Sequence, residues 1–405
     1  MSVVGKPLPD SRPAASPLKD SLSSLAPTLR RVSRDLFENP ELSGEESKAC
    51  SLLVGLLSEA GFDVERNVAN LATAFLARYA FGDGGHPQIG LFCEYDALPE
   101  LGHACGHNLI ASASLVAGLA LAKGLDLPRG EVWVIGSPAE ETFGGKVSLL
   151  RSGHLADLDA AMMFHPGPET RVCSLRSVAT APTEIVFYPE RIPGIAQERR
   201  PNPVLAVASL FQSIQSVASG LSGASCPGVI LEGGRRPNLT PKRTVARFSF
   251  RAKTQPLLRR LMHEVLRCVR EASRTSDCSF SMRRYEAGYE PLLVNQTIGK
   301  VCERYLQDEG LAVLSAPPES PGAYDIGNVS RCIPVIHPII NRGFEGVLTH
   351  TEEFAERAGS EEGIQCATLA ARVLALTAQE LLTQPELLAA AQDELSHEVG
   401  PKAGQ

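Results

Sequence analysis

Three short apolar runs in the first half of this chain are each followed by polar side chains. The runs cover residues 88–94, 131–136 and 158–164, and an Ala- and Leu-rich segment at 109–125 has the composition of a helix. Alternating strands and helices predict an α/β sheet with helices on both faces. Such sheets bind ligands beyond the carboxyl ends of their strands, so the polar residues that follow the runs are candidate site residues.

Length and charge predict two domains. The 405 residues are too many for one ordinary core. Residues 179–287 carry 17 Lys and Arg against 8 Asp and Glu, whereas the rest of the chain carries 22 against 38. This segment also follows the order β-α-β-β-α-β, which predicts a split ferredoxin-like unit. We therefore expect an N-terminal arm at 1–20, a larger domain at 21–178 and 288–405, and an inserted domain at 179–287.

Composition argues against several classes of protein. No run of 18 apolar residues is present, so a membrane span is not expected. The first 19 residues lack the apolar stretch of a secretory signal, and the ten scattered cysteines contain no CxxC pair, which predicts a reduced, cytoplasmic protein. Aromatic residues make up only 5% of the chain, which disfavours nucleic acid as a partner. The basic segment could attract an anionic substrate, or it could be a solvated Arg-rich face.

The polar residues include a set of metal-ligand types. Cys105 and His107 are two residues apart and could bind one metal or bridge two; a soft thiolate with an imidazole suits zinc and other late transition ions. Adjacent carboxylates at Glu140 and Glu141 follow a predicted strand, where one could bind a cation while the other takes a proton from water. His165 also follows an apolar run.

Each of these signals alone has an ordinary structural explanation. A Cys and a His close together are more often structural, an acidic pair is often a solvated loop, and a single histidine is usually hydrogen-bonded in a core. Together they form a set that is large enough for two metals sharing one ligand, with Glu140 left as a free base: Cys105, His107, Glu141, His165 and His350.

Five motifs resemble those of the dinuclear metallopeptidases. They lie at residues 39–46, 94–99, 102–108, 138–141 and 325–329. The branch that they resemble contains aminoacylases, hippurate hydrolases, auxin-conjugate hydrolases and aminobenzoyl-glutamate hydrolase. Within it, Glu-Tyr-Asp-Ala-Leu-Pro followed by Gly-His-Ala-Cys-Gly-His-Asn is most similar to the beta-alanyl-lysine-type dipeptidases. The resemblance spans nearly the whole chain after residue 25 and is weaker in the insert.

The resemblance implies a catalytic domain with a zinc-peptidase-like fold and an inserted lid that forms a homodimer contact. It implies two divalent ions, zinc first, with manganese, cobalt or nickel as alternatives. Cys105 would bridge the ions and Glu140 would be the general base, while Asp96 would orient a ligand. The remaining implied ligands are His107, Glu141, His165 and His350.

Three residues are candidates for substrate binding. Asn238 lies in the segment 233–241, which matches a family loop whose Asn contacts substrate, and Arg251 is a candidate partner for a substrate carboxylate. Tyr324 adds a hydroxyl where the family's Gly-Ser-x-Asp reads Gly-Ala-Tyr-Asp. Ordinary turn and strand chemistry is the alternative explanation for Asn238 and Arg251.

One departure from the family pattern concerns the lid. A family histidine that helps to hold the oxyanion is replaced by Ile192, and the insert contains no histidine except His263. Loss of one oxyanion donor typically slows a reaction by about a hundred- to a thousandfold. Nearby arginines that could substitute are Arg191, Arg199 and Arg200.

Three hypotheses follow. The first is a metal-dependent amidohydrolase or dipeptidase that cleaves a small N-acyl amino acid, dipeptide or similar carboxylate-bearing conjugate with a metal-activated water. The second is a relative with altered chemistry, such as amide formation or acyl transfer. The third is a non-catalytic, metal-stabilised binding protein, which would have no need for Glu140 as a free base.

Overall fold

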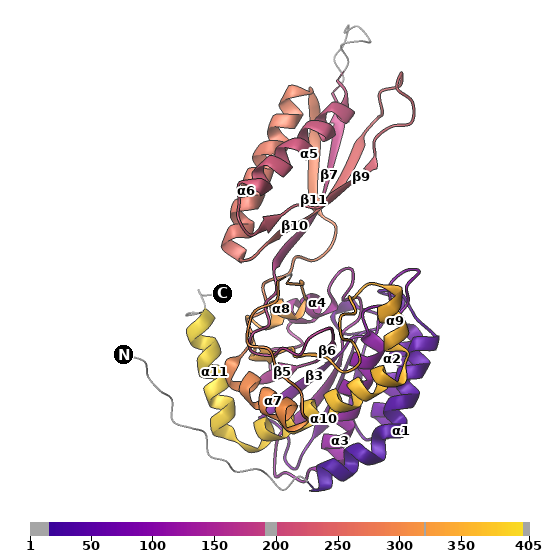
Figure 1. Ribbon diagram of the computed structural model, residues 1–405, viewed down its shortest axis with the longest axis vertical. Helices are drawn as coiled ribbons and strands as arrows, with labels where there is room; N and C mark the ends of the chain where they lie inside the picture. The colour runs from indigo at the N-terminus through magenta and orange to yellow at the C-terminus, as the bar shows by residue number, and fades with distance from the viewer. Residues whose placement is uncertain (1–15, 191–200, 320, 400–405) are drawn as a thin grey trace.

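Two groups of elements with separate hydrophobic cores make up the structure. The computed structural model describes residues 16–190, 201–319 and 321–399. Figure 1 shows a large unit, which contains both ends of the described chain, and a small unit of residues 179–284 that stands on it. Buried apolar side chains form one cluster in each unit. The predicted α/β class is confirmed, and the small unit interrupts the large one in the sequence.

A six-stranded mixed sheet forms the centre of the large unit. Its strands are, in spatial order, β1 (Asp63–Arg66), β2 (Phe75–Ala80), β4 (Glu131–Gly136), β3 (Gln88–Cys93), β5 (Ala160–Met162) and β12 (Val335–Ile336). The strands β4, β3, β5 and β12 are parallel, whereas β2 pairs antiparallel with both β1 and β4. Every residue of β3 is buried, as expected for a strand covered on both faces. A separate parallel pair joins β6 (His165–Pro166) to β13 (Ile339–Ile340).

Helices cover this sheet. They are α1 (Ser16–Glu38), α2 (Ser47–Glu59), the 3₁₀ turn η1 (Val68–Asn70), α3 (His107–Gly124), α4 (Gly145–Arg151), α7 (Gln296–Asp308), α8 (Ile326–Val329), α9 (Glu352–Ala358), α10 (Glu361–Thr383) and α11 (Pro385–Val399). Helix α3 packs on β3 and β4, and α1 and α10 pack against α3. Residues 107–121 of α3 are all buried, which is typical of a helix that is apolar all round. A Cβ added at Gly118 would lie 2.3 Å from Cγ2 of Val134, so glycine is needed for the close approach to the sheet.

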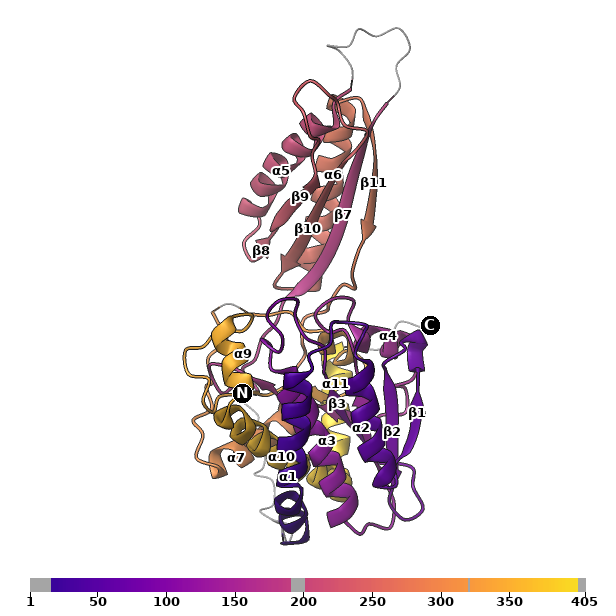
Figure 2. The same cartoon turned by 90° about the vertical axis from the view of Figure 1, so that its right-hand side faces the viewer.

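The small unit combines a five-stranded sheet with two helices. Its elements are β7 (Ala179–Pro189), α5 (Pro203–Ser219), β8 (Ala224–Ser225), β9 (Gly228–Glu232), β10 (Thr244–Ala252), α6 (Gln255–Thr275) and β11 (Cys278–Arg284). The sheet order is β11-β7-β10-β8, and β9 also pairs with β10. Both helices lie on one face of this sheet (Figure 2). Helix α6 buries Leu258, Leu261, Val265, Val269 and Ala272 at helical spacing, so its apolar stripe faces the sheet.

The first described helix begins earlier than the sequence suggests. Helix α1 starts at Ser16, so residues 16–20 of the predicted arm at 1–20 are helical, and residues 1–15 lie outside the described part of the chain. The physical reason is Leu18, which is completely buried in the core of the large unit and whose backbone packs against Gly124. In the described residues, no helix is both long and apolar enough to cross a membrane.

Candidate metal centre

The polar residues that follow the apolar runs meet at one edge of the large sheet. Asp96 follows β3, Glu140 and Glu141 follow β4, and His165 follows β5. Because β3, β4 and β5 are parallel, their carboxyl ends lie together. His107 is the first residue of α3, which begins at the same edge. The sheet therefore collects chemical groups that are far apart in the sequence.

Cys105 is shared by two groups of possible ligand atoms. One group contains Cys105, His107 and His165, and the other contains Cys105, Glu141 and His350; in each group the atoms lie within 4.8 Å of one another. The Cys105 thiol lies 3.3 Å from Nε2 of His165. Cys105 is therefore the residue that these two groups have in common, and its expected bridging role stays a prediction. A third group of His107, Glu140 and Glu141 meets the same 4.8 Å limit, so Glu140 also lies within reach of a cation.

His350 reaches this set from a distant part of the chain. Its ring Nε2 lies 3.5 Å from Oε1 of Glu141, and the side chain is about half exposed. Its backbone N–H donates to the carbonyl of Ala104 at 2.8 Å, which ties the His350 loop to the segment that carries Cys105. All five predicted ligands are therefore brought together in the structure.

Two unpaired atoms in this set indicate that a cation fits. Nε2 of His107 and Oε1 of Glu141 are buried, and neither makes a hydrogen bond of good geometry with a described residue. The polar atoms beside them are Oε2 of Glu94, 3.5 Å from Nε2 of His107, and Nε2 of His350, 3.5 Å from Oε1 of Glu141. Leaving a buried polar atom unpaired typically costs about 1–3 kcal/mol, and a bound cation would satisfy both atoms. The donor set of one thiol, three imidazoles and carboxylates suits zinc or a similar ion. Burial raises the pKa of the Cys105 thiol, so a bound ion would have to displace its proton.

Asp96 orients two members of the set. Nδ1 of His107 donates to Oδ1 of Asp96 at 2.9 Å, which leaves Nε2 of the ring free for a cation. The backbone N–H of Glu141 donates to Oδ2 at 3.1 Å, and the Ser43 hydroxyl donates to the same oxygen at 2.7 Å. Burial alone would raise the pKa of Asp96, but the charge and the hydrogen bond of His107 lower that pKa to about 2. The role proposed for Asp96 thus has a direct geometric basis.

Glu140 is half-buried beside further acidic groups. Burial raises its pKa well above the ordinary value, and the nearby carboxylates of Glu94 and Glu141 raise it further. Its backbone carbonyl accepts a hydrogen bond from the Tyr289 hydroxyl at 2.8 Å. A carboxylate with a raised pKa holds a proton more readily than an ordinary carboxylate, as a group that takes a proton from water must.

Four residues that support the site were not assigned a role from the sequence. Glu46 is completely buried, and its carboxylate accepts hydrogen bonds from Thr73 and from the backbone of Ala139. Lys146 is completely buried between the carboxylates of Glu94 and Asp325. Glu46, Glu94 and Asp325 lie inside the family motifs, and this position in the sequence could have indicated a role for them. No motif contains Lys146, so nothing in the sequence indicated its role.

The candidate centre opens into a cavity of about 440 Å³. Two of the three predicted substrate-binding residues, Arg251 and Tyr324, line this cavity together with Cys105, Glu140 and His350. Arg251 belongs to β10 of the small unit. It pairs with Thr180 at the start of β7, where the chain leaves the large unit, so it lies at the end of the small unit that is next to the large one. The cavity therefore combines residues from both units.

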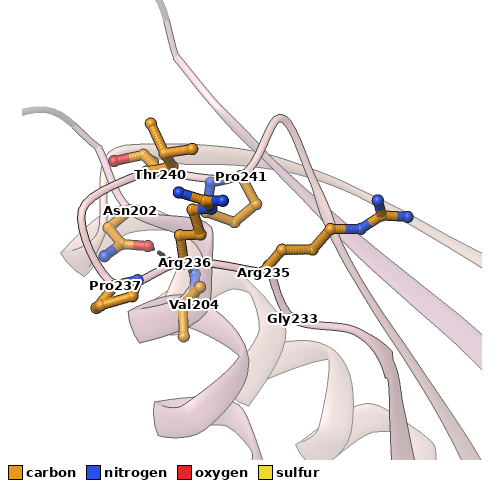
Figure 3. Close-up of a pocket in the computed structure, with 10 residues that line it drawn as sticks. Asn202, Val204, Gly233, Arg235, Arg236, Pro237, Thr240 and Pro241 are labelled. Carbon is orange, nitrogen blue, oxygen red and sulfur yellow. Dashed lines mark hydrogen bonds between the residues drawn. The ribbon is translucent and has the colours of Figure 1, made fainter.

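Asn238 lies elsewhere. It belongs to the loop between β9 and β10, at the end of the small unit that points away from the large unit (Figure 1). The register of the sheet explains this position, because Thr244 after the loop pairs with Phe187 near the far end of β7. Residues of this loop and of the start of α5 line a separate hollow of about 300 Å³. Figure 3 shows Arg236 among the other lining side chains, whereas Arg235 extends away from them.

The segment in which the family histidine is missing lies outside the described residues. Ile192 and the three arginines considered as substitutes, Arg191, Arg199 and Arg200, all lie in the segment 191–200. His263, the remaining histidine of the insert, is exposed on α6.

Comparison with known proteins identifies the family. Residues 91–374 match peptidase family M20/M25/M40, and the chain belongs to this family. It is 31% identical over 390 residues to the Xaa-Arg dipeptidase of Homo sapiens, covering 91% of this chain and 89% of that protein. It is 33% identical over 198 residues to one component of the p-aminobenzoyl-glutamate hydrolase of Escherichia coli, covering 44% of this chain and 40% of that protein.

Solved structures share the fold. The aminobenzoyl-glutamate utilization protein of Klebsiella pneumoniae superimposes with a TM-score of 0.67 at 16% identity, covering 88% of this chain and 98% of that chain. A dinuclear metal binding peptidase of the M20 family from Bacillus subtilis gives a TM-score of 0.61 at 20% identity, covering 87% and 99%. With the family assignment and the clustered ligand groups, the chain is an enzyme, a metal-dependent hydrolase of the peptidase and amidohydrolase class.

Proposed function

We propose that this enzyme cleaves the amide bond of a small dipeptide, N-acyl amino acid or similar conjugate that carries a carboxylate. The observation that carries the proposal is the pair of unpaired buried atoms, His107 Nε2 and Glu141 Oε1, beside the half-buried Glu140. A binding site for a cation alone would not require a carboxylate with a raised pKa next to it. Amide hydrolysis uses both features.

The residues that would hold two divalent ions are Cys105, His107, Glu141, His165 and His350. Such ions, zinc first and manganese, cobalt or nickel as alternatives, supply a lowered pKa for a water molecule when they are bound. Glu140 accepts the proton that the attacking water loses, and then gives it to the nitrogen of the leaving amine. Asp96 keeps His107 in the tautomer whose Nε2 is free.

Arg251 supports a substrate that carries a carboxylate. Its guanidinium lines the cavity, and its Nε donates to the Ser249 hydroxyl at 3.2 Å, which leaves its terminal nitrogens available. A guanidinium binds a carboxylate through two parallel hydrogen bonds. The two relatives are named for a dipeptide and for an aminobenzoyl-glutamate, and both of these molecules carry such a group. Their likeness to this chain supports the same substrate class here.

A homodimer through the small unit is part of the proposal. Val229, Ile230 and Leu231 are exposed on β9, which leaves an apolar strand uncovered. Such strands tend to be covered by another chain. Asn238, at the far end of this unit, would then contact substrate in the partner. Sedimentation at micromolar concentration tests this, and a purely monomeric profile would contradict it.

All ten cysteines are free thiols, which supports a cytoplasmic location.

The decisive experiment combines metal analysis with turnover. Wild type, Glu140→Gln and the control Glu59→Gln, at an exposed helix end, would be assayed for metal content and for hydrolysis of N-acyl amino acids and dipeptides. We expect about two ions per chain in all three proteins and loss of turnover only in Glu140→Gln. If Glu140→Gln loses its metal, Glu140 is a ligand and the role of free base is wrong.

Other outcomes select between the alternatives. Wild type that holds two ions but hydrolyses no amide would favour amide formation or acyl transfer, for which the substitution at Ile192 is the motivating feature. Tight ligand binding without turnover, unaffected by Glu140→Gln, would favour a metal-stabilised binding protein. Absence of stoichiometric metal would contradict all three hypotheses.

A further inference from the structure

The hydroxyl of Tyr324 is a hydrogen-bond donor without a partner among the described residues. Tyr324 lines the cavity together with Cys105 and Glu140, and both of these groups are close enough to influence its pKa. None of the described residues accepts a hydrogen bond from Oη of Tyr324. A partly buried phenol normally finds an acceptor, so this donor is available to a bound substrate.

The ring of Tyr324 is held on several sides. It packs edge-on against His337, with ring centroids 4.8 Å apart and an interplanar angle of 77°. A Cβ added at Gly322 would lie 2.7 Å from Oη, so glycine at that position leaves room for the hydroxyl. The next residue, Asp325, is fixed by the ammonium of Lys146 at 2.7 Å and by the backbone N–H of Lys146 at 3.0 Å. The hydroxyl is therefore a preorganised donor.

Two arginines of the cavity are already engaged. Arg171 binds Glu169 and the carbonyl of Ala316, and Arg176 binds the carbonyls of Cys173 and Leu175. Arg251 also keeps its terminal nitrogens available, and the proposal assigns these to the substrate carboxylate. Tyr324 offers a second available donor, a neutral hydroxyl close to Cys105 and Glu140.

We infer that the Tyr324 hydroxyl donates a hydrogen bond to the substrate carbonyl oxygen as negative charge develops on it. The inference rests on the proposed amide hydrolysis, and it assigns to this chain an oxyanion donor of its own in place of the histidine that Ile192 replaces. Attack by water forms a bond to the carbonyl carbon and moves the π electrons onto oxygen, where the phenol stabilises them without losing its proton. Burial raises the pKa of Tyr324, so the hydroxyl stays protonated at neutral pH.

Tyr324→Phe removes the hydroxyl and keeps the ring against His337. We expect kcat to fall by about a hundredfold while KM changes by less than about threefold, because the hydrogen bond strengthens only as the oxyanion forms. Metal content and melting temperature should match those of wild type. The control Tyr79→Phe removes a hydroxyl within the aromatic cluster of Phe62 and Phe81, and should leave kcat unchanged.

A binding measurement provides a second readout. A phosphinic analogue of the best dipeptide substrate mimics the tetrahedral oxyanion, so Tyr324→Phe should weaken its binding by a factor similar to the loss in kcat. Binding of the product amino acid should not change. Equal effects on the analogue and the product, or a loss of metal, would mean that Tyr324 has only a structural role and would overturn the inference.

Different experimental results would contradict the oxyanion role of Tyr324 and the proposed function. Active wild type with an equally active Tyr324→Phe would overturn the oxyanion role and leave the hydrolase proposal in place. Wild type that cleaves no amide would overturn the proposed function, and the inference with it.

Discussion

Lys146→Met tests the charge balance beside the candidate centre. The Lys146 ammonium is completely buried, bonds the carboxylate of Glu94, and lies 2.7 Å from Oδ1 of Asp325. Glu140 belongs to the same cluster, since one oxygen each of Glu94, Glu140 and Asp325 lie within 4.8 Å of one another. The ammonium therefore occupies a position where three acidic groups would otherwise repel.

The magnitude follows from burial and from the number of partners. Removing one partner of a buried ion pair typically costs about 3–5 kcal/mol, because the remaining charge is left without compensation. Here two carboxylates lose their partner, so we expect a value near the upper end, about 4–5 kcal/mol. A large domain loses about 2 °C in melting temperature for each kcal/mol, which gives a decrease of about 8–10 °C.

The assay is thermal unfolding after treatment with a chelator, so that metal binding does not contribute. The exposed Lys48→Met is the matched control and should change the free energy of unfolding by less than about 0.5 kcal/mol. Adding Asp325→Asn to Lys146→Met should recover about 1–3 kcal/mol, because it removes one of the uncompensated charges. A loss below about 1 kcal/mol, or strictly additive effects, would refute the idea that Lys146 holds these acids together.

Three further predictions concern pH, metal and substrate. Burial lowers the pKa of His103 to about 4. In the unfolded chain His103 takes up a proton near pH 6.5, whereas in the folded chain it stays neutral until about pH 4. The free energy of unfolding should therefore fall by about 3 kcal/mol as the pH is lowered from 6.5 to 4. Chemical denaturation of metal-free wild type and His103→Gln checks this, and equal pH slopes would contradict it. Chelation should abolish activity and lower the melting temperature, and ions restored at about a thousand times Kd should return about 4 kcal/mol; an unchanged melting temperature would exclude a tight site. Arg251→Ala should raise KM about tenfold for substrates with a free carboxylate and leave amidated substrates unaffected, so parallel losses on both would remove the carboxylate role.

The clustering of the candidate ligands could be predicted because most of its signals are local. Metal ligands come from few residue types, and the positions after parallel strands meet at one edge whatever the loop lengths. The motifs around Cys105 and Glu141 therefore indicated one edge of the sheet before any contact was known, and the structure places both residues there with His350, which lies outside these motifs. The α/β class could be predicted for the same reason, since it follows from the order of apolar runs.

The supporting residues could not be predicted, because their roles depend on tertiary contacts. Nothing in the sequence distinguishes Lys146 from an exposed lysine, and its burial follows from how α4 packs against Asp325. Asn238 shows the opposite case, in which a local motif is present but its distance from the site depends on sheet register. Because Thr244 pairs with Phe187, the loop that carries Asn238 lies at the far end of the small unit.

The geometry of Glu140 and Glu141 depends on acids outside the predicted ligand set. Ala139, directly before them, has φ +57°, a left-handed conformation that costs a residue with a Cβ about 1 kcal/mol or more. Glu46 offsets this cost, because its buried carboxylate accepts the Ala139 N–H at 2.9 Å. Asp96 accepts the N–H of Glu141 in the same way. The turn can therefore hold both glutamates at the cavity only while Glu46 and Asp96 stay ionised. Burial raises the pKa of Glu46, whereas His107 lowers that of Asp96 to about 2, so a loss of activity in acid should begin at Glu46 before it reaches Asp96.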